Sequence, residues 1–275
     1  LFSRGIPQRA CLDELASRWL AVAASLLLSA CFEMSSVVTL NKDGTASIQE
    51  TALVGAQLKA MMGSLGDQGG SPGGPNLKDL VPDKAKADER AKKLGEGVTV
   101  KSHEAVKMPD GREGVKVTYA VADINKLKYQ PFDAKDKDGG ENKPITFAAS
   151  GGTVTVSMPP DKPKSGPPAD KPKMPAEQMQ AQMAMMKPMF AGMRMAIQIK
   201  GANGIASSDA TNQSGDTVTI MDIQFDKIME KPEVFGKFME TADDKDMSPA
   251  KAAEAFKGVD GIKVEGKEKI TIKLK

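Results

Sequence analysis

Short segments that alternate apolar and polar residues, separated by glycine-containing turns, constrain the fold of this chain more than any other feature of its sequence. In the clearest case, residues 113–121, every second residue from Val115 to Val121 is apolar or aromatic. The turn Pro109-Asp110-Gly111-Arg112 separates this segment from a second alternating segment, residues 97–108. Alternation with a period of two predicts half-buried strands, and a turn between two such segments predicts a β-hairpin.

Comparable patterns recur along the chain between helical segments. They predict hairpins at residues 37–40 with 45–53, 145–149 with 153–158, and 203–211 with 217–225, and further strands at 193–200, 261–265 and 269–274. Predicted helices cover 57–65, 83–94, 176–190, 226–240 with an interruption at Pro232, and 248–256. Because hairpins are interleaved with helices and no parallel βαβ series is visible, we predict the α+β class, a mostly antiparallel sheet built from hairpins with packed helices.

A separate signal precedes the first predicted strand. Arg18 is followed by an uncharged run, residues 19–29, as in a secretory signal peptide. The run is shorter than the roughly 20 residues that a permanent membrane-spanning helix needs. It ends in Leu28, Ser29, Ala30 and Cys31, which resembles the lipobox of bacterial lipoproteins. The resemblance implies cleavage before Cys31 and acylation of its thiol and new amino terminus, whereas the alternative is a buried helix with an ordinary core cysteine.

These features predict the domain organisation. Residues 1–30 form the signal peptide, and acidic Asp13 and Glu14 indicate that residues 1 to about 16 are a misread leader if the true start lies downstream. Residues 31–245 form one α+β domain, with flexible loops at 66–76 and 159–175 that are rich in Gly or in Pro and Lys. Residues 246–275 add a helix and two strands that pack on the same domain.

The lipid anchor makes the membrane the first expected partner. It predicts a location in the bacterial cell envelope, outside the cytoplasm. Phe32 follows Cys31, where an Asp often favours retention in the inner membrane, so in bacteria with two membranes the outer membrane is favoured.

Composition excludes several other classes of partner. The chain has 38 Lys and Arg residues against 36 Asp and Glu residues, so no strong field attracts nucleic acid. One Trp and two Tyr leave few surfaces on which bases stack. The only cysteines are Cys11, in the predicted leader, and Cys31, so we expect no disulfide in the mature protein.

The sequence shows no constellation of catalytic residues. Its single histidine, His103, lies in a predicted strand, and neither zinc-ligand spacing nor Gly-x-Ser-x-Gly is present. We interpret Asp243-Asp244 as solvated surface charge and Gly201-Ala202-Asn203-Gly204 as a turn, because the latter lacks the Lys of a phosphate loop. We therefore expect a protein that is not an enzyme and that has no metal or cofactor, with an unrecognised hydrolase as the alternative.

Eight methionines between Met174 and Met195 form an unusual local cluster. One face of the predicted helix carries Met179, Met183, Met186 and Phe190 at helical spacing. Three interpretations remain open: a face packed on the core, a soft apolar surface for lipid chains or a partner, or thioether capture of Cu(I).

The chain also resembles the LppM-like lipoprotein domain over about residues 31–225. The resemblance implies a membrane-tethered α+β domain that binds lipid or glycolipid in the envelope. This chain departs from that pattern, because it lacks the C-terminal transmembrane helix common in the family and it inserts the Pro-Lys segment and the Met-rich helix. The residues that carry the resemblance are the lipobox, Asp43-Gly44-Thr45, Ala122-Asp123-Ile124 with Leu127, Met193-Arg194-Met195, residues 201–205 and residues 215–220.

Together these features predict a non-enzymatic, lipid-anchored envelope protein that acts as a binding or envelope-organising module, with a lipid, a glycolipid or another envelope protein as partner. The alternative within this class is a carrier or sensor of a hydrophobic ligand through the Met-rich helix.

Overall fold

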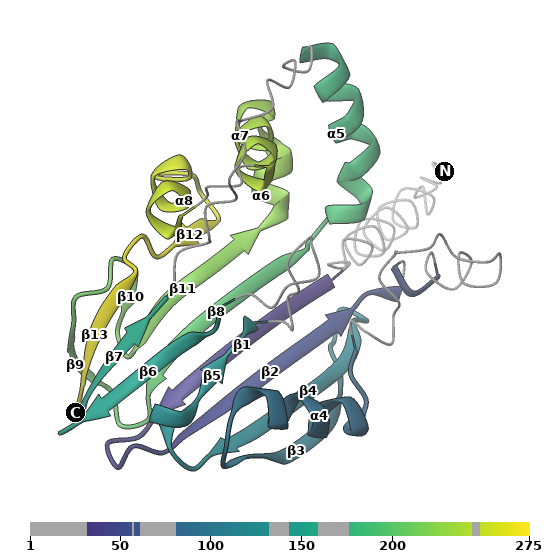
Figure 1. Cartoon of the computed structure of the whole chain (residues 1–275). Coiled ribbons are helices and arrows are strands. Elements are labelled where there is room, and N and C mark those ends of the chain that lie inside the picture. Colours follow the sequence, from purple (N-terminus) through teal and green to yellow (C-terminus); the bar gives the residue numbers. More distant parts are fainter. Residues whose placement is uncertain (1–31, 57, 61–80, 132–142, 159–175, 244–247) are drawn as a thin grey trace, which may run out of the picture.

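The computed structural model describes residues 32–56, 58–60, 81–131, 143–158, 176–243 and 248–275, and in these ranges two sheets dominate the fold (Figure 1). The larger sheet has the strand order β10-β11-β8-β1-β2-β4-β3, with β12 paired to β11, and the smaller sheet has the order β5-β6-β7-β13-β9. The strands of the larger sheet are β1 (Phe32–Leu40), β2 (Ala46–Val54), β3 (Val98–Lys107), β4 (Glu113–Val121), β8 (Arg194–Gly201), β10 (Gln213–Ser214), β11 (Thr217–Gln224) and β12 (Ile262–Val264). Those of the smaller sheet are β5 (Lys128–Tyr129), β6 (Ile145–Ser150), β7 (Thr153–Ser157), β9 (Ile205–Ser208) and β13 (Lys269–Leu274).

Three of the described helices, α4, α7 and α8, begin at a capping side chain or a proline. Asp83 accepts a hydrogen bond from the Lys86 amide at the start of α4, and Ser248 accepts one from the Lys251 amide at the start of α8. The predicted interruption at Pro232 is present, since α6 ends at Glu230 and α7 begins at Pro232. Proline has no amide proton to donate to the preceding turn, so the first helix cannot continue through it. The helices are α4 (Lys84–Leu94), the short 3₁₀ helix η1 (Ile124–Lys126), α5 (Ala176–Phe190), α6 (Phe225–Glu230), α7 (Pro232–Asp243) and α8 (Pro249–Ala255).

Nearly all strand pairs are antiparallel, so the predicted α+β class is confirmed. The β1–β2, β3–β4 and β6–β7 hairpins form as expected. The first is longer than predicted, because β1 begins at Phe32, which pairs with Val54. The β1–β8 pair is parallel, with Glu33 opposite Arg194 and Leu40 opposite Gly201.

The predicted hairpin of residues 203–211 with 217–225 is wrong. β11 forms its hairpin with β10, whereas β9 leaves the larger sheet and pairs with β13 in the smaller one. Gly204 adopts a φ of +102°, which only glycine tolerates readily, and the Ile205 amide then donates to the Asp216 carboxylate at 3.1 Å. This turn places the buried side chain of Ile205 beside Leu274, so that burial against β13 replaces pairing with β11.

Two apolar clusters lie on one face of the larger sheet. The first fills the space between this face, the smaller sheet and α4, and it includes Val38 and Ile199, which pair across β1 and β8. The second lies under α5 to α8, and Met195, on the same face of β8 as Ile199, packs against it. The opposite face carries exposed polar residues such as Gln49 and Lys200, as is common for antiparallel sheets.

Candidate functional site

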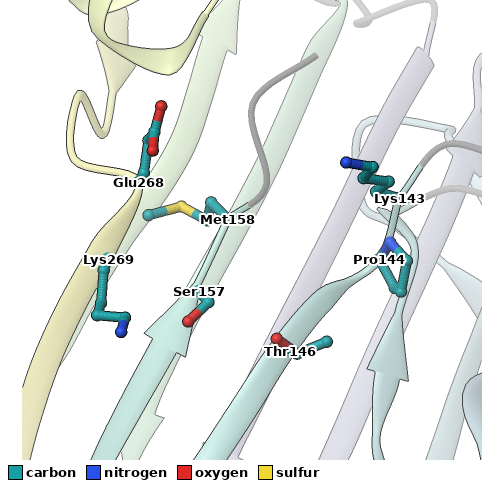
Figure 2. Close-up of a pocket in the computed structure, with 7 residues that line it drawn as sticks. All are labelled: Lys143, Pro144, Thr146, Ser157, Met158, Glu268 and Lys269. Atoms are coloured by element: carbon teal, nitrogen blue, oxygen red, sulfur yellow. The ribbon is translucent and has the colours of Figure 1, made fainter. Parts of the chain in front are cut away.

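A surface groove lies at one end of the smaller sheet. Three of its residues form a row across neighbouring strands, because Thr146 on β6 pairs with Ser157 on β7, and Ser157 pairs with Lys269 on β13. The groove has a volume of about 430 Å³ (Figure 2). We call it the sheet-end groove, and its lining residues are Lys143, Pro144, Thr146, Ser157, Met158, Glu268 and Lys269.

The sheet-end groove combines positive charge with hydroxyl groups over an apolar floor. Lys143 and Lys269 stand at opposite sides of it, with Thr146 and Ser157 between them (Figure 2). Met158 is buried, and its amide donates to the Glu268 carbonyl at 2.7 Å, which ties the end of β7 to the strand beside it. Ammonium groups and hydroxyls together suit a ligand that carries an anionic group and several hydroxyls.

Sequence inspection did not identify these residues. Thr146, Ser157 and Lys269 lie in three segments, and only the β6–β7–β13 pairing brings them together. The polar positions in the alternating pattern of each strand were the one available signal, but they do not show which strands become neighbours.

A second groove, of about 300 Å³, lies between α5 and α7, and we call it the helix groove. Met179 on α5 reaches toward Gly236 on α7, where an added Cβ atom would lie 3.6 Å from the methionine sulfur. The lining residues are Met179, Gln180, Pro232, Glu233, Gly236, Lys237 and Glu240.

The predicted apolar face of α5 packs mainly on the second cluster. Met183 is buried, and Met179, Met186 and Phe190 are partly buried against that cluster. Phe190 stacks on Phe225 with ring centroids 5.5 Å apart and an interplanar angle of 17°. The packing favours the first of the three interpretations for this face, while Met179 also reaches the helix groove.

A polar cluster is enclosed between the larger sheet, α4 and β5. The Arg90 guanidinium donates to both carboxylate oxygens of Glu50, from Nε at 2.6 Å and from Nη2 at 2.5 Å, and Nη2 also donates to the Gln130 carbonyl at 2.8 Å. Burial lowers the pKa of Arg90, but the hydrogen bond and the charge of Glu50 outweigh burial and raise it. Arg90 therefore stays charged and fixes α4 to β2.

Three hydroxyls beside this ion pair are fully enclosed. The side chains of Ser36, Tyr119 and Tyr129 are at most 1% exposed, and their hydroxyls make no hydrogen bond within the part of the chain that the structure describes. Burial first, and then the Glu50 charge, raise the pKa of both tyrosines far above the ordinary value. Both phenols remain neutral at physiological pH.

The other residues singled out in the sequence have varied positions. His103 lies on β3, with its Nε2 atom 2.9 Å from the Pro82 carbonyl oxygen. Gly201 to Gly204 form a turn, as predicted. Leu28, Ser29, Ala30, Cys31, Asp244 and the loops 66–76 and 159–175 lie outside the described residues.

Within the described ranges, no group of three or more His, Cys, Asp or Glu side chains is arranged to hold a metal ion. None of the helices in those ranges is both long enough and apolar enough to cross a membrane.

Comparison with known proteins identifies no family for this chain. No family model matches the sequence, and no curated protein matches it. Among solved structures, the chain is similar to the folded domain of LppM from Mycobacterium tuberculosis, solved by NMR, with a TM-score of 0.28 and 12% sequence identity. The match covers 69% of this chain and 81% of that chain. This is a weak structural resemblance.

Proposed function

We propose that this chain is a non-enzymatic, lipid-anchored binding module of the bacterial cell envelope, and that its sheet-end groove binds the anionic headgroup of a lipid or glycolipid. The observation that carries the ligand class is the row of Thr146, Ser157 and Lys269, faced by Lys143 across the groove. The anchor is supported by the sequence that ends in Cys31.

The groove chemistry favours a headgroup over a purely apolar ligand. Lys143, Lys269, Thr146 and Glu268 are exposed and Ser157 is half-buried, so a ligand meets solvated polar groups before it meets Met158. Two ammonium groups against one carboxylate leave a local positive charge that attracts phosphate or another anion. The hydroxyls add hydrogen-bonding partners for a glycerol or sugar headgroup.

Ligand binding is tested with the full chain reconstituted in phosphatidylcholine vesicles and titrated calorimetrically. Glycerophosphoglycerol, a water-soluble anionic headgroup, is expected to bind, and glycerophosphocholine is expected to bind more weakly. Replacing Lys143 and Lys269 together by Gln should abolish the difference. Lys273→Gln is the matched control, because Lys273 is also exposed on β13 but lies outside the groove. Equal loss in the control, or no loss in the double variant, would contradict the headgroup assignment.

The anchor is tested separately. Cys31→Ser should stop labelling by palmitate analogues and release the protein from the membrane fraction. Unchanged labelling and fractionation of this variant would remove the anchor from the proposal but leave the groove chemistry to be judged by the titration.

A second candidate function is supported by the helix groove. Met179 offers a polarizable thioether there, and such side chains adapt to irregular apolar ligands or partner surfaces. In this alternative, Met179→Gln lowers the binding of a fluorescent lipid, while Met185→Gln, on an exposed position of the same helix, does not. If neither change affects binding, or if the wild type binds no lipid, the helix groove is not a ligand site.

A further inference from the structure

The first described strand leaves no room for a linker between the fold and the proposed anchor. Phe32 is only 5% exposed and pairs with Val54 at the first position of β1. Cys31 precedes it directly in the sequence, and consecutive Cα atoms are about 3.8 Å apart. β1 itself is held on both sides, by β2 and by β8. An acyl group on Cys31 is therefore attached almost directly to a rigid central strand.

The strand register shows which parts of the molecule share this end, which we call the Phe32 end. Val54, the partner of Phe32, pairs with Glu113, and Glu113 pairs with Lys107. The β3–β4 turn, residues 108–112, therefore projects from the Phe32 end. The β1–β2 turn, residues 41–45, lies at the opposite end, about 27 Å away along the eight residue steps of β1.

The surface of the Phe32 end suits contact with lipid headgroups. At the β3–β4 turn, Met108 is 36% exposed, and the side chain of Lys107 beside it is 79% exposed. An exposed apolar side chain next to a long cationic one is suited to a bilayer interface. Lys107 shares Glu113 with Lys59, and the other charges of this end pair as Arg112 with Glu33 and Asp110, and Arg194 with Asp222.

The sheet-end groove belongs to the same half of the molecule. At the far end of the smaller sheet, the β6–β7 turn approaches the β1–β2 turn, because an added Cβ atom on Gly152 would lie 3.8 Å from the Lys42 side chain. β6 runs in the same general direction as β1 (Figure 1). The other ends of β6, β7 and β13, which form the groove, therefore point toward the Phe32 end.

We infer that the protein stands on the bilayer on its Phe32 end, with the β3–β4 turn at the headgroups and the sheet-end groove turned toward them. This inference rests on the proposed acylation of Cys31 and adds a fixed orientation to it. The groove then receives its ligand from the membrane surface on which the protein stands. The β1–β2 turn points away from that surface.

The orientation is measured with one fluorophore at each end. Met108→Cys marks the β3–β4 turn, and Lys42→Cys, also at an exposed turn residue, is the matched control. A thioether-linked Cys31 does not react with the dye, so the unsubstituted chain gives the labelling background. The lipidated full chain is reconstituted in vesicles of equal phosphatidylethanolamine and phosphatidylglycerol that carry a headgroup spin-labelled lipid as quencher. Quenching is expected to be several-fold stronger at residue 108 than at residue 42, because about 27 Å of strand separates the two ends.

Each other outcome overturns the inference in a recognisable way. Equal quenching of both dyes on vesicle-bound protein shows that the domain lies flat or tumbles on its anchor. Stronger quenching at residue 42 shows the reverse orientation. In both cases the anchor stands, because the protein remains bound to the vesicles. Protein that does not associate with vesicles at all removes the proposed anchor together with the orientation.

Discussion

Arg90 on α4 and Glu50 on β2 form a bidentate ion pair, and their side chains are only 10% and 16% exposed, respectively. The pair joins α4 to β2, in the middle of the larger sheet. Because both groups are withdrawn from water, each depends on the other for compensation of its charge.

Glu50→Gln should therefore destabilise the fold strongly. The change leaves the Arg90 charge largely buried without its carboxylate, and such a loss costs about 3–5 kcal/mol. The free energy of unfolding is measured by urea titration. Glu230→Gln is the control, because it breaks an exposed pair with Lys227 on α6 and should cost less than about 1 kcal/mol. Similar losses of unfolding free energy in both variants would show that the buried pair stabilises the fold no more than the exposed pair does.

Tyr119→Phe should leave stability unchanged or raise it at neutral pH. The variant removes a buried hydroxyl that has no partner among the described residues, and an unsatisfied group of this kind costs about 1–3 kcal/mol. A fall in the melting temperature would show that the hydroxyl is bonded after all.

The same tyrosine should affect stability in alkaline solution. Because its pKa is raised in the folded state, its contribution is complete below the unfolded value of about 10 and is lost as the pH rises above that value. Thermal unfolding followed from neutral to alkaline pH should show a shallower decline for Tyr119→Phe than for the wild type. Parallel curves would exclude Tyr119 as a source of the alkaline loss.

Two methionines of α5 provide a matched test of the core interpretation. Met183 is 8% exposed, whereas Met185 is 73% exposed on the same helix. Met183→Gln buries an amide among apolar side chains and should cost about 1–3 kcal/mol. Met185→Gln should change stability by no more than about 0.5 kcal/mol. Chemical denaturation distinguishes the two, and equal effects would show that α5 does not pack through this face.

Asp216 should contribute to stability at neutral pH and lose that contribution in acid. The Ile205 amide hydrogen bond and the Lys275 charge lower the pKa of its carboxyl. A lowered pKa means that the contribution is present above the unfolded value of about 3.9 and disappears as the pH falls through the folded value. Asp216→Asn should therefore reduce the slope of melting temperature against pH in acid, and an unchanged slope would count against this carboxyl.

The local elements of this fold could be predicted from the sequence, but several long-range pairings could not. Alternation and glycine turns identified the β1–β2, β3–β4 and β6–β7 hairpins, because hairpin partners are neighbours in sequence. The parallel contact of Val38 with Ile199 joins strands more than 150 residues apart, and neither segment specifies the other. The assignment of β9 failed for the same reason, since its partner β13 comes some 60 residues later.

The candidate site was less predictable than the fold. The α5 face was found because helical periodicity is a local property. Thr146, Ser157 and Lys269 form a row only after three strands have paired, and the partnership of Glu50 with Arg90 likewise depends on how α4 settles on the sheet. Taken alone, none of these residues differs from an ordinary surface or strand residue.

The position of β13 has a consequence for how the protein is made. This strand follows every other described strand in the sequence, yet it lies between β7 and β9, with Ile270 and Ile272 completely buried. Until it emerges, both neighbours expose unpaired backbone edges, which are prone to pair with other chains. If the protein is exported as an unfolded chain, the smaller sheet closes only when residues 269–274 have crossed the membrane. A chain whose export stops before that point keeps the edges of β7 and β9 unpaired, and chaperones and proteases can bind such exposed edges.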